Sequence, residues 1–426
     1  MTSYTLFKNA RLLDPATGLD ISGEILIQDG KISDIGEQVT TPADAEVIDC
    51  GGKCLCPGLI DMRVFVGIPG ADYKDTIENT GEAAAAGGVT TVCVQPVTDP
   101  IIDDMARVEY METRARKAKV NFIPFPAITK QLEGKEMTEI GLMSKAGVKA
   151  FTDGNKSIAN PALMSRVLRY AAMFDALIIQ HLAVSELSGG CMNAGALATR
   201  MGLPGISTMA ETIMLERDIR LLQSVPTRYH AAQITCQDSI EVVAAAKRNK
   251  LAITAGVAVP HFSLNEYAIE EYRTFTKLSP PLRAESDRVA VLGGLKDGTI
   301  DVIVSGHDPE DPESKRVPYE LAEAGVIGLE TMLPVALEIY HNGHMPLLDI
   351  LAKMTCNPAR ILGLDGGTLA KGAPADLCIF DPDVPYKIDP EKMVSLTKNT
   401  PFDGRPIQGR VLRTVVGGKT VFEYQA

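Results

Sequence analysis

The chain has 426 residues, of which 45% are hydrophobic, and a formal net charge of −12. This acidic balance argues against nucleic acid or an anionic membrane as a partner, and no apolar run approaches the roughly 20 residues of a membrane span. Eight scattered cysteines, and a start that lacks the basic and apolar segments of a signal peptide, predict reduced thiols and a cytoplasmic location.

The first part of the chain shows short runs of alternating polarity that predict a small antiparallel β unit. Asp29-Gly30 stands between two of these runs and is typical of a hairpin turn. The end of the chain has the same pattern, with a Gly-Gly turn at 417–418. We therefore predict that both ends combine into one β-sandwich domain of residues 1–55 and 358–426. The expected strands of this domain are 5–7, 24–27, 31–32, 46–48, 375–380, 410–416 and 420–422.

Between the two ends, candidate strands alternate with amphipathic helical stretches. Eight such repeats predict an α/β fold, a (β/α)8 barrel of residues 56–357. In a barrel of this type the functional site lies at the C-terminal ends of the strands. The eight expected barrel strands are 59–65, 88–94, 120–124, 148–151, 176–179, 228–232, 252–254 and 301–304.

Specific motifs occur along almost the whole chain. Among them are Cys-Pro-Gly-Leu-Ile-Asp at 56–61, Ser-Pro-Pro-Leu-Arg at 279–283 and Cys-Asn-Pro-Ala-Arg at 356–360. In these motifs the sequence resembles the class I dihydroorotases of the amidohydrolase superfamily, the type found in bacteria. The resemblance implies a TIM-type amidohydrolase barrel with a small β domain. The other matching motifs lie at 86–91, 298–301, 373–377 and 400–404.

The resemblance places four of the family's metal-binding positions on residues that are not the usual ligands. Its His-x-His pair falls on Arg63 and Phe65. A guanidinium has no lone pair to give, and a phenyl ring has no donor atom. A later histidine ligand falls on Gln233, and the aspartate that binds metal and moves protons falls on Gly306. The metal site is therefore expected to be degenerate.

Two substrate positions are also lost in this alignment to the family. The arginine that clamps the substrate falls on Gly67, and the asparagine of the family's Pro-Asn-Thr segment falls on Val97. The surviving polar residues are candidates for a pocket or a weak metal site, or else have become buried residues that bond only to protein or water. These residues are Asp153, His181, His261 and His307.

The chemistry explains why the losses matter together. Zinc needs three or four converging donors before it can lower the pKa of a bound water, and an acid–base group must then move the proton. A clamp on the substrate carboxylate fixes its orientation. Because ligands, acid–base group and clamp are all altered, we expect no catalytic residue and no cofactor.

The loss of metal raises a question about charge. A buried Asp153 without metal would be an uncompensated carboxylate, which is costly. Arg63 stands where a metal ligand stood, so we expect its guanidinium to replace the metal charge by pairing with Asp153. A separate acidic, Pro-rich segment at 308–315 is expected to be a solvated loop rather than a docking element.

Three functions remain open on the sequence alone. The resemblance to non-catalytic dihydroorotase-like proteins implies a structural or regulatory partner of aspartate carbamoyltransferase in pyrimidine biosynthesis, itself expected to form homo-oligomers. The alternative is an active dihydroorotase or related cyclic-amide hydrolase, with one zinc in a rebuilt site. A third possibility is a protein that senses a small acidic ligand through Arg63.

Overall fold

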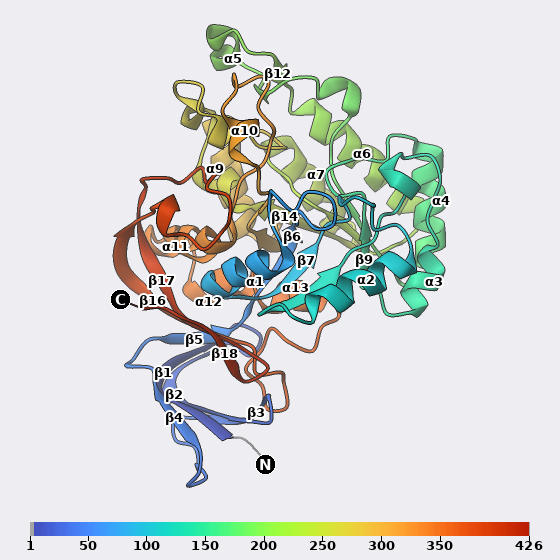
Figure 1. The fold of residues 1–426 in the computed structure, drawn as a ribbon. Coiled ribbons are helices and arrows are strands. Elements are labelled where there is room, and N and C mark those ends of the chain that lie inside the picture. The colour runs from blue at the N-terminus through green and yellow to red at the C-terminus, as the bar shows by residue number, and fades with distance from the viewer. Residues whose placement is uncertain (1–3, 426) are drawn as a thin grey trace.

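The computed structural model describes residues 4–425, and its two chain ends share one sheet (Figure 1). The strands run in the order β18-β17-β16-β5-β1-β2-β3, with β4 paired to β1. The ends join where β5 pairs antiparallel with β16, with Cys56 opposite Cys378. The strands are β1 (Tyr4–Asp14), β2 (Leu19–Gln28), β3 (Lys31–Gly36), β4 (Glu46–Asp49), β5 (Cys54–Pro57), β16 (Leu377–Lys387), β17 (Pro406–Val416) and β18 (Lys419–Glu423).

The alternating sequence pattern explains this sheet. Side chains such as Leu12, Ile25 and Leu377 are fully buried in one cluster because residues two apart on a strand face the same side. Asp29 and Gly30, with φ of 49° and 79°, form the turn between β2 and β3, as the sequence predicted. The domain drawn from both termini is one continuous eight-stranded sheet.

The middle of the chain forms a barrel of eight parallel strands, three in one ladder and five in another. The ladders meet where the N–H of Phe65 donates to the carbonyl of His307 and the N–H of Thr152 donates to that of Pro126. This confirms the predicted fold class. The barrel strands are β6 (Leu59–Val64), β7 (Val89–Val94), β8 (Asn121–Pro124), β9 (Ala150–Thr152), β10 (Leu177–Gln180), β13 (Tyr229–Ala231), β14 (Ile253–Ala258) and β15 (Val302–Val304).

Helices surround the barrel (Figure 1). Their starts follow ordinary capping rules: the Thr76 side chain accepts from an N–H of α1, and Asn160 caps α4, which begins with a proline. No helix within residues 4–425 combines the length and apolar character needed to cross a bilayer. The larger helices are α1 (Ile77–Ala86), α2 (Met105–Ala115), α4 (Pro161–Ala172), α6 (Met209–Ser224), α7 (Gln237–Arg248), α9 (Glu285–Lys296) and α11 (Met332–His341).

Shorter elements complete the chain. β11 (Met192–Asn193) and β12 (Gly205–Ile206) form a small separate ladder, and α8 (Val259–Ser263) follows β14 directly. All eight cysteines are free thiols in the structure, as expected for reduced cysteines. The other short helices are α3 (Ile140–Lys145), α5 (Ala196–Met201), α10 (Pro312–Lys315), α12 (Leu347–Ala352) and α13 (Cys356–Leu362). The 3-10 turns are η1 (Lys130–Leu132), η2 (Ser185–Leu187), η3 (Glu266–Ile269), η4 (Thr274–Thr276), η5 (Leu329–Thr331) and η6 (Pro390–Lys392).

The long ribbon of β16 and β17 connects the sheet to the barrel. It passes along α11, and Gly409 of β17 lies against Leu337 of that helix. A Cβ at Gly409 would lie 2.4 Å from the Leu337 Cδ1 atom, and its φ is +105°. Only glycine tolerates both conditions, so this residue allows the ribbon to lie against the helix.

Candidate degenerate active site

Arg63 lies near the C-terminal end of β6. Its side chain is almost completely buried, and Nη1 donates a hydrogen bond to the backbone carbonyl of Gly154, at 3.2 Å. Its Cζ atom lies 5.1 Å from the ring centroid of Phe65, so the two substituted positions pack on each other. Burial lowers the pKa of Arg63 to about 10, although the carboxylates of Asp308 and Asp61 oppose the shift. Arg63 therefore remains a cation at neutral pH.

Asp153 does not pair with Arg63, so that expectation was wrong. Its Oδ1 accepts hydrogen bonds from the N–H groups of Ile128 and Thr129, at 2.8 and 2.9 Å, and its Oδ2 accepts from the Thr129 hydroxyl at 2.5 Å. Burial raises the pKa of Asp153 to about 6, against the effect of these bonds. The carboxylate is thus satisfied by the loop after β8 and needs no cation.

His181 and His261 are both buried beside the guanidinium. The Nδ1 atom of each ring has no hydrogen-bond partner, whereas Nε2 of His261 lies 2.9 Å from the carbonyl of Pro280 and donates to it. Burial lowers the pKa of His181 to about 3 and that of His261 to about 4, and the charge of Arg63 lowers both further. Both rings are therefore neutral at pH 7, and the cation near them is the guanidinium of Arg63.

His307 has a structural role. Its backbone bridges Val64 on one side and Val326 on the other, which closes the barrel between β15 and β6. Its ring is fully buried; Nδ1 accepts from the N–H of Gly328, and Nε2 lies 3.5 Å from the Asp75 carboxylate. With both ring nitrogens engaged, His307 is not free to bind a metal.

Gln233 and Gly306 lie close together at the ends of β13 and β15, the two strands that flank β14. A Cβ at Gly306 would lie 3.9 Å from Nε2 of Gln233 and only 2.9 Å from the Cβ of Ala258. Gly306 also has a φ of +68°, which side chains rarely tolerate. The buried Oε1 atom of Gln233 has no partner. The backbone at this place suits glycine and would strain an aspartate.

Gly67 and Val97, the two expected substrate positions, line a cavity of about 340 Å3 at the barrel mouth, together with Phe65 and Asp308. At Gly67 a Cβ would lie 2.2 Å from the carbonyl oxygen of Ala71, so the turn excludes any side chain there. Val97 packs directly against Gly154. Neither position therefore offers a polar side chain that could clamp an anionic substrate.

The segment that begins at Asp308 is not the solvated loop that its composition predicted. Glu310 is buried and pairs with Lys74 at 2.7 Å. Lys315 is 3% exposed, and its ammonium donates to the carbonyl of Glu323. Burial raises the pKa of Asp308 to about 7, and nearby Glu310 raises it further. Glu310 and Lys315 each have a partner that allows their charge to be buried on the barrel, which an acidic, Pro-rich composition cannot reveal.

These residues do not fit zinc. Asp153 and His307 are already bonded, Arg63 and Phe65 supply no donor, and the position of the acid–base aspartate is Gly306. No group of three or more His, Cys, Asp or Glu residues within 4–425 is placed to hold a metal ion. Of the surviving candidates, only His181 and His261 present unpartnered ring nitrogens, and two nitrogens fall short of a zinc site.

Comparisons with known proteins agree on the ancestry of the chain. Residues 52–239 match the Dihydro-orotase-like family, and residues 331–422 match the Amidohydrolase family. A dihydroorotase of Anaplasma phagocytophilum is 42% identical over 98% of this chain and 95% of its own length. A dihydroorotase of Syntrophotalea carbinolica is 40% identical over 98% of each chain.

Solved structures show the same fold. The L-hydantoinase (dihydropyrimidinase) from Arthrobacter aurescens superposes with a TM-score of 0.89 at 24% identity, covering 100% of this chain and 97% of its own. A D-hydantoinase superposes with a TM-score of 0.87 at 22% identity over 99% of this chain and 95% of its own. The chain is 40 to 42% identical to these dihydroorotases along almost its whole length, and it has this barrel and sheet. It therefore belongs to the dihydroorotase family of amidohydrolases.

Proposed function

We propose that this member of the dihydroorotase family does not hydrolyse cyclic amides through zinc, and that it acts as a structural partner of aspartate carbamoyltransferase. The observation that carries the first half is the buried guanidinium of Arg63, which stands where the family has a metal ligand. A fixed cation repels a divalent metal, and Phe65 beside it offers no donor. The partner, self-association and a cytoplasmic location rest on the resemblance and the composition.

A second candidate, an active dihydroorotase or cyclic-amide hydrolase with one zinc, is favoured by a different observation. Relatives that are 40 to 42% identical along the whole chain are named dihydroorotase. His181 and His261 are the residues from which such a site would have to be rebuilt, because their Nδ1 atoms are free. The names of the relatives favour this candidate, whereas the donor set of this chain favours the first.

The two candidates differ in metal content and turnover. The purified full chain is analysed for zinc, and dihydroorotase activity is assayed in both directions with and without added zinc. We expect less than a tenth of an equivalent of zinc, on the order of contamination, and no turnover above buffer. About one equivalent of zinc together with turnover would establish the second candidate and overturn the first.

The partner is tested separately. The chain is mixed with the aspartate carbamoyltransferase of the same organism, and the mass of each protein and of the mixture is measured by light scattering. We expect a homo-oligomer of the chain alone and a larger, stoichiometric complex with the transferase. Two proteins that elute at their separate masses across a range of concentrations would refute the partner role but leave the loss of hydrolysis standing.

A further inference from the structure

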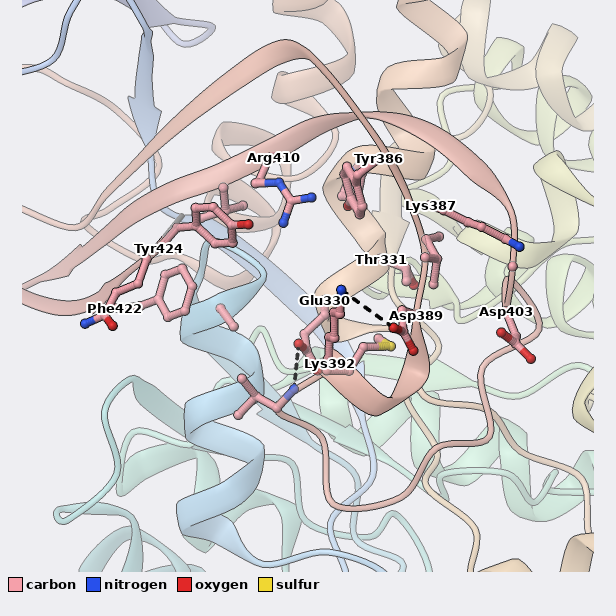
Figure 2. Close-up of a pocket in the computed structure, with 18 of the residues that line it drawn as sticks. Glu330, Thr331, Tyr386, Lys387, Asp389, Lys392, Asp403, Arg410, Phe422 and Tyr424 are labelled. Carbon is pink, nitrogen blue, oxygen red and sulfur yellow. Dashed lines mark hydrogen bonds and ion pairs between the residues drawn. The ribbon is translucent and has the colours of Figure 1, made fainter.

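A second cleft, separate from the cavity at the barrel mouth, lies where the sheet built from the two chain ends meets the barrel helices. It has a volume of about 730 Å3 and is bounded by the ribbon of β16 and β17, the end of β18, and the barrel helices α1 and α11 (Figure 2). Ligand pockets of proteins commonly occupy this range of volumes and often lie between domains. The cleft shares no residue with the degenerate site, so its function is a separate question.

Arg410 is the distinctive residue of this cleft. Its Cζ atom lies 3.9 Å from the ring centroid of Tyr386 and 4.5 Å from that of Tyr424. Figure 2 shows the guanidinium between the two rings, at the edge of the open space. Contact with two rings holds the group by its faces through cation–π attraction and leaves its N–H edge free to donate within its own plane.

That N–H edge has no protein partner. Within residues 4–425, no hydrogen bond or ion pair involves the Arg410 side chain. Two acids of the cleft are already engaged: Glu330 accepts from the N–H groups of Val394 and Ser395, and Glu423 pairs with Arg413. The guanidinium is therefore a fixed cation with unused donors that faces a cavity.

The rest of the wall adds apolar surface. Pro334, Met393, Val411 and Phe422 line the cleft. Asp403 lies at the end of the cleft away from Arg410 (Figure 2). A ligand at Arg410 therefore meets a planar pair of donors at one end and hydrocarbon beside it.

We propose that this cleft binds a small organic carboxylate with an apolar body. The carboxylate accepts two parallel hydrogen bonds from the N–H edge of Arg410, the geometry that a guanidinium fork favours. The body of the ligand packs between Tyr424 and the apolar wall. Such a site is independent of zinc and of the partner proposed above.

Benzoate is a suitable probe because it combines a carboxylate with a flat apolar body. Calorimetric titration of the full chain should give one site with a Kd of about 1 mM or tighter. Arg410→Gln should weaken binding at least about tenfold, and Arg410→Lys should do nearly the same because a lysine cannot form the planar fork. Inorganic phosphate, an anion without an apolar body, should bind more weakly than benzoate.

Three further variants keep the test decisive. Arg166→Gln removes an exposed arginine of α4 and the same charge, and should leave benzoate affinity unchanged. Tyr424→Leu changes a side chain that is 39% exposed, so the fold should survive while affinity falls several-fold. Arg63→Gln should bind as the parent does. Equal binding by the parent and Arg410→Gln, loss of binding only in Arg63→Gln, or no binding by the folded parent would overturn the proposal.

Discussion

The guanidinium of Arg63 donates to the carbonyl of Gly154, at 3.2 Å, and not to the carboxylate of Asp153 one residue earlier. Asp153 instead takes three hydrogen bonds from Ile128 and Thr129. The guanidinium of Arg63 and the carboxylate of Asp153 thus both have hydrogen-bond partners, but different ones. The Asp153 carboxylate is therefore not left without partners.

Histidines placed at the three positions where the family is expected to have them should create a zinc site. A chain with Arg63→His, Phe65→His and Gln233→His would remove the cation and add three imidazoles beside His181, which together meet the donor number of zinc. We expect about one equivalent of zinc by elemental analysis. Arg63→His alone is the control and should bind no stoichiometric zinc. A folded triple variant without zinc would mean that the strand ends no longer converge on one point.

Gly306 should resist substitution for a local reason. Its φ of +68° and the 2.9 Å approach of a Cβ to Ala258 predict that Gly306→Ala lowers the free energy of unfolding by about 1–3 kcal/mol. Gly293→Ala in α9 is the matched control, because nothing lies within 4 Å of its Cβ position. That control should stabilise by about 0.5–1 kcal/mol. Urea unfolding measures the free energy of unfolding of both variants. Equal changes in the two variants would show that the backbone at Gly306 does not require glycine.

The ion pair of Lys74 with Glu310 should hold the segment after Asp308 on the barrel. The Glu310 side chain is 6% exposed, and burial raises its pKa against the opposing effect of Lys74. Lys74→Met therefore leaves a buried, unpaired acid, and we expect a loss of about 1–3 kcal/mol. Adding Glu310→Gln should recover part of this loss. A double-mutant cycle from urea unfolding would refute the pairing if the coupling free energy were near zero.

His230 should make the fold sensitive to acid. Burial lowers its pKa to about 3, and Nδ1 lies 2.8 Å from the Thr254 hydroxyl. As the pH falls below about 6.5, the ordinary pKa of histidine, His230 is protonated in the unfolded chain but stays neutral in the folded one. The free energy of unfolding therefore falls. One such group costs about 2 kcal/mol between pH 6.5 and pH 5, and the loss continues toward pH 3.

The measurement is the free energy of unfolding in urea at a series of pH values. His230→Asn keeps a polar atom near Thr254 but does not titrate, so its stability should fall less steeply below pH 6.5 than that of the parent. Thr254→Val removes the partner without removing the titrating ring and should keep the steep fall. Parallel curves for His230→Asn and the parent would show that the ring is protonated in the folded state.

Much of the fold follows from local patterns. The eight barrel strands lie close to the predicted segments, since buried parallel strands read as short apolar runs between helices. Asp29-Gly30 forms the predicted turn. These features depend on residues close together in the sequence, where periodicity and turn chemistry act directly.

The details of the site could not be read in this way. Two of the three donors to Asp153 are the backbone N–H groups of Ile128 and Thr129, and no sequence pattern marks a backbone donor. The burial of Glu310 depends on Lys74, far away in the chain. Composition describes the average environment of a segment, whereas burial of a charge is decided by one distant partner. Only the presence of Lys74 could have indicated that Glu310 is buried. The residues around Lys74 in the sequence, however, do not distinguish it from any other lysine.

The seam between β5 and β16 has a consequence for biosynthesis. The N-terminal strands leave the ribosome first. The edge of β5 at Cys56 pairs with β16 at Cys378, however, and β16 is synthesised only after the entire barrel. A long loop must therefore close before the sheet is complete, and such distant pairings form slowly. Until then the open edge is a template for the wrong strand. A nascent chain that lacks its last strands therefore carries an unpaired strand edge, which favours aggregation.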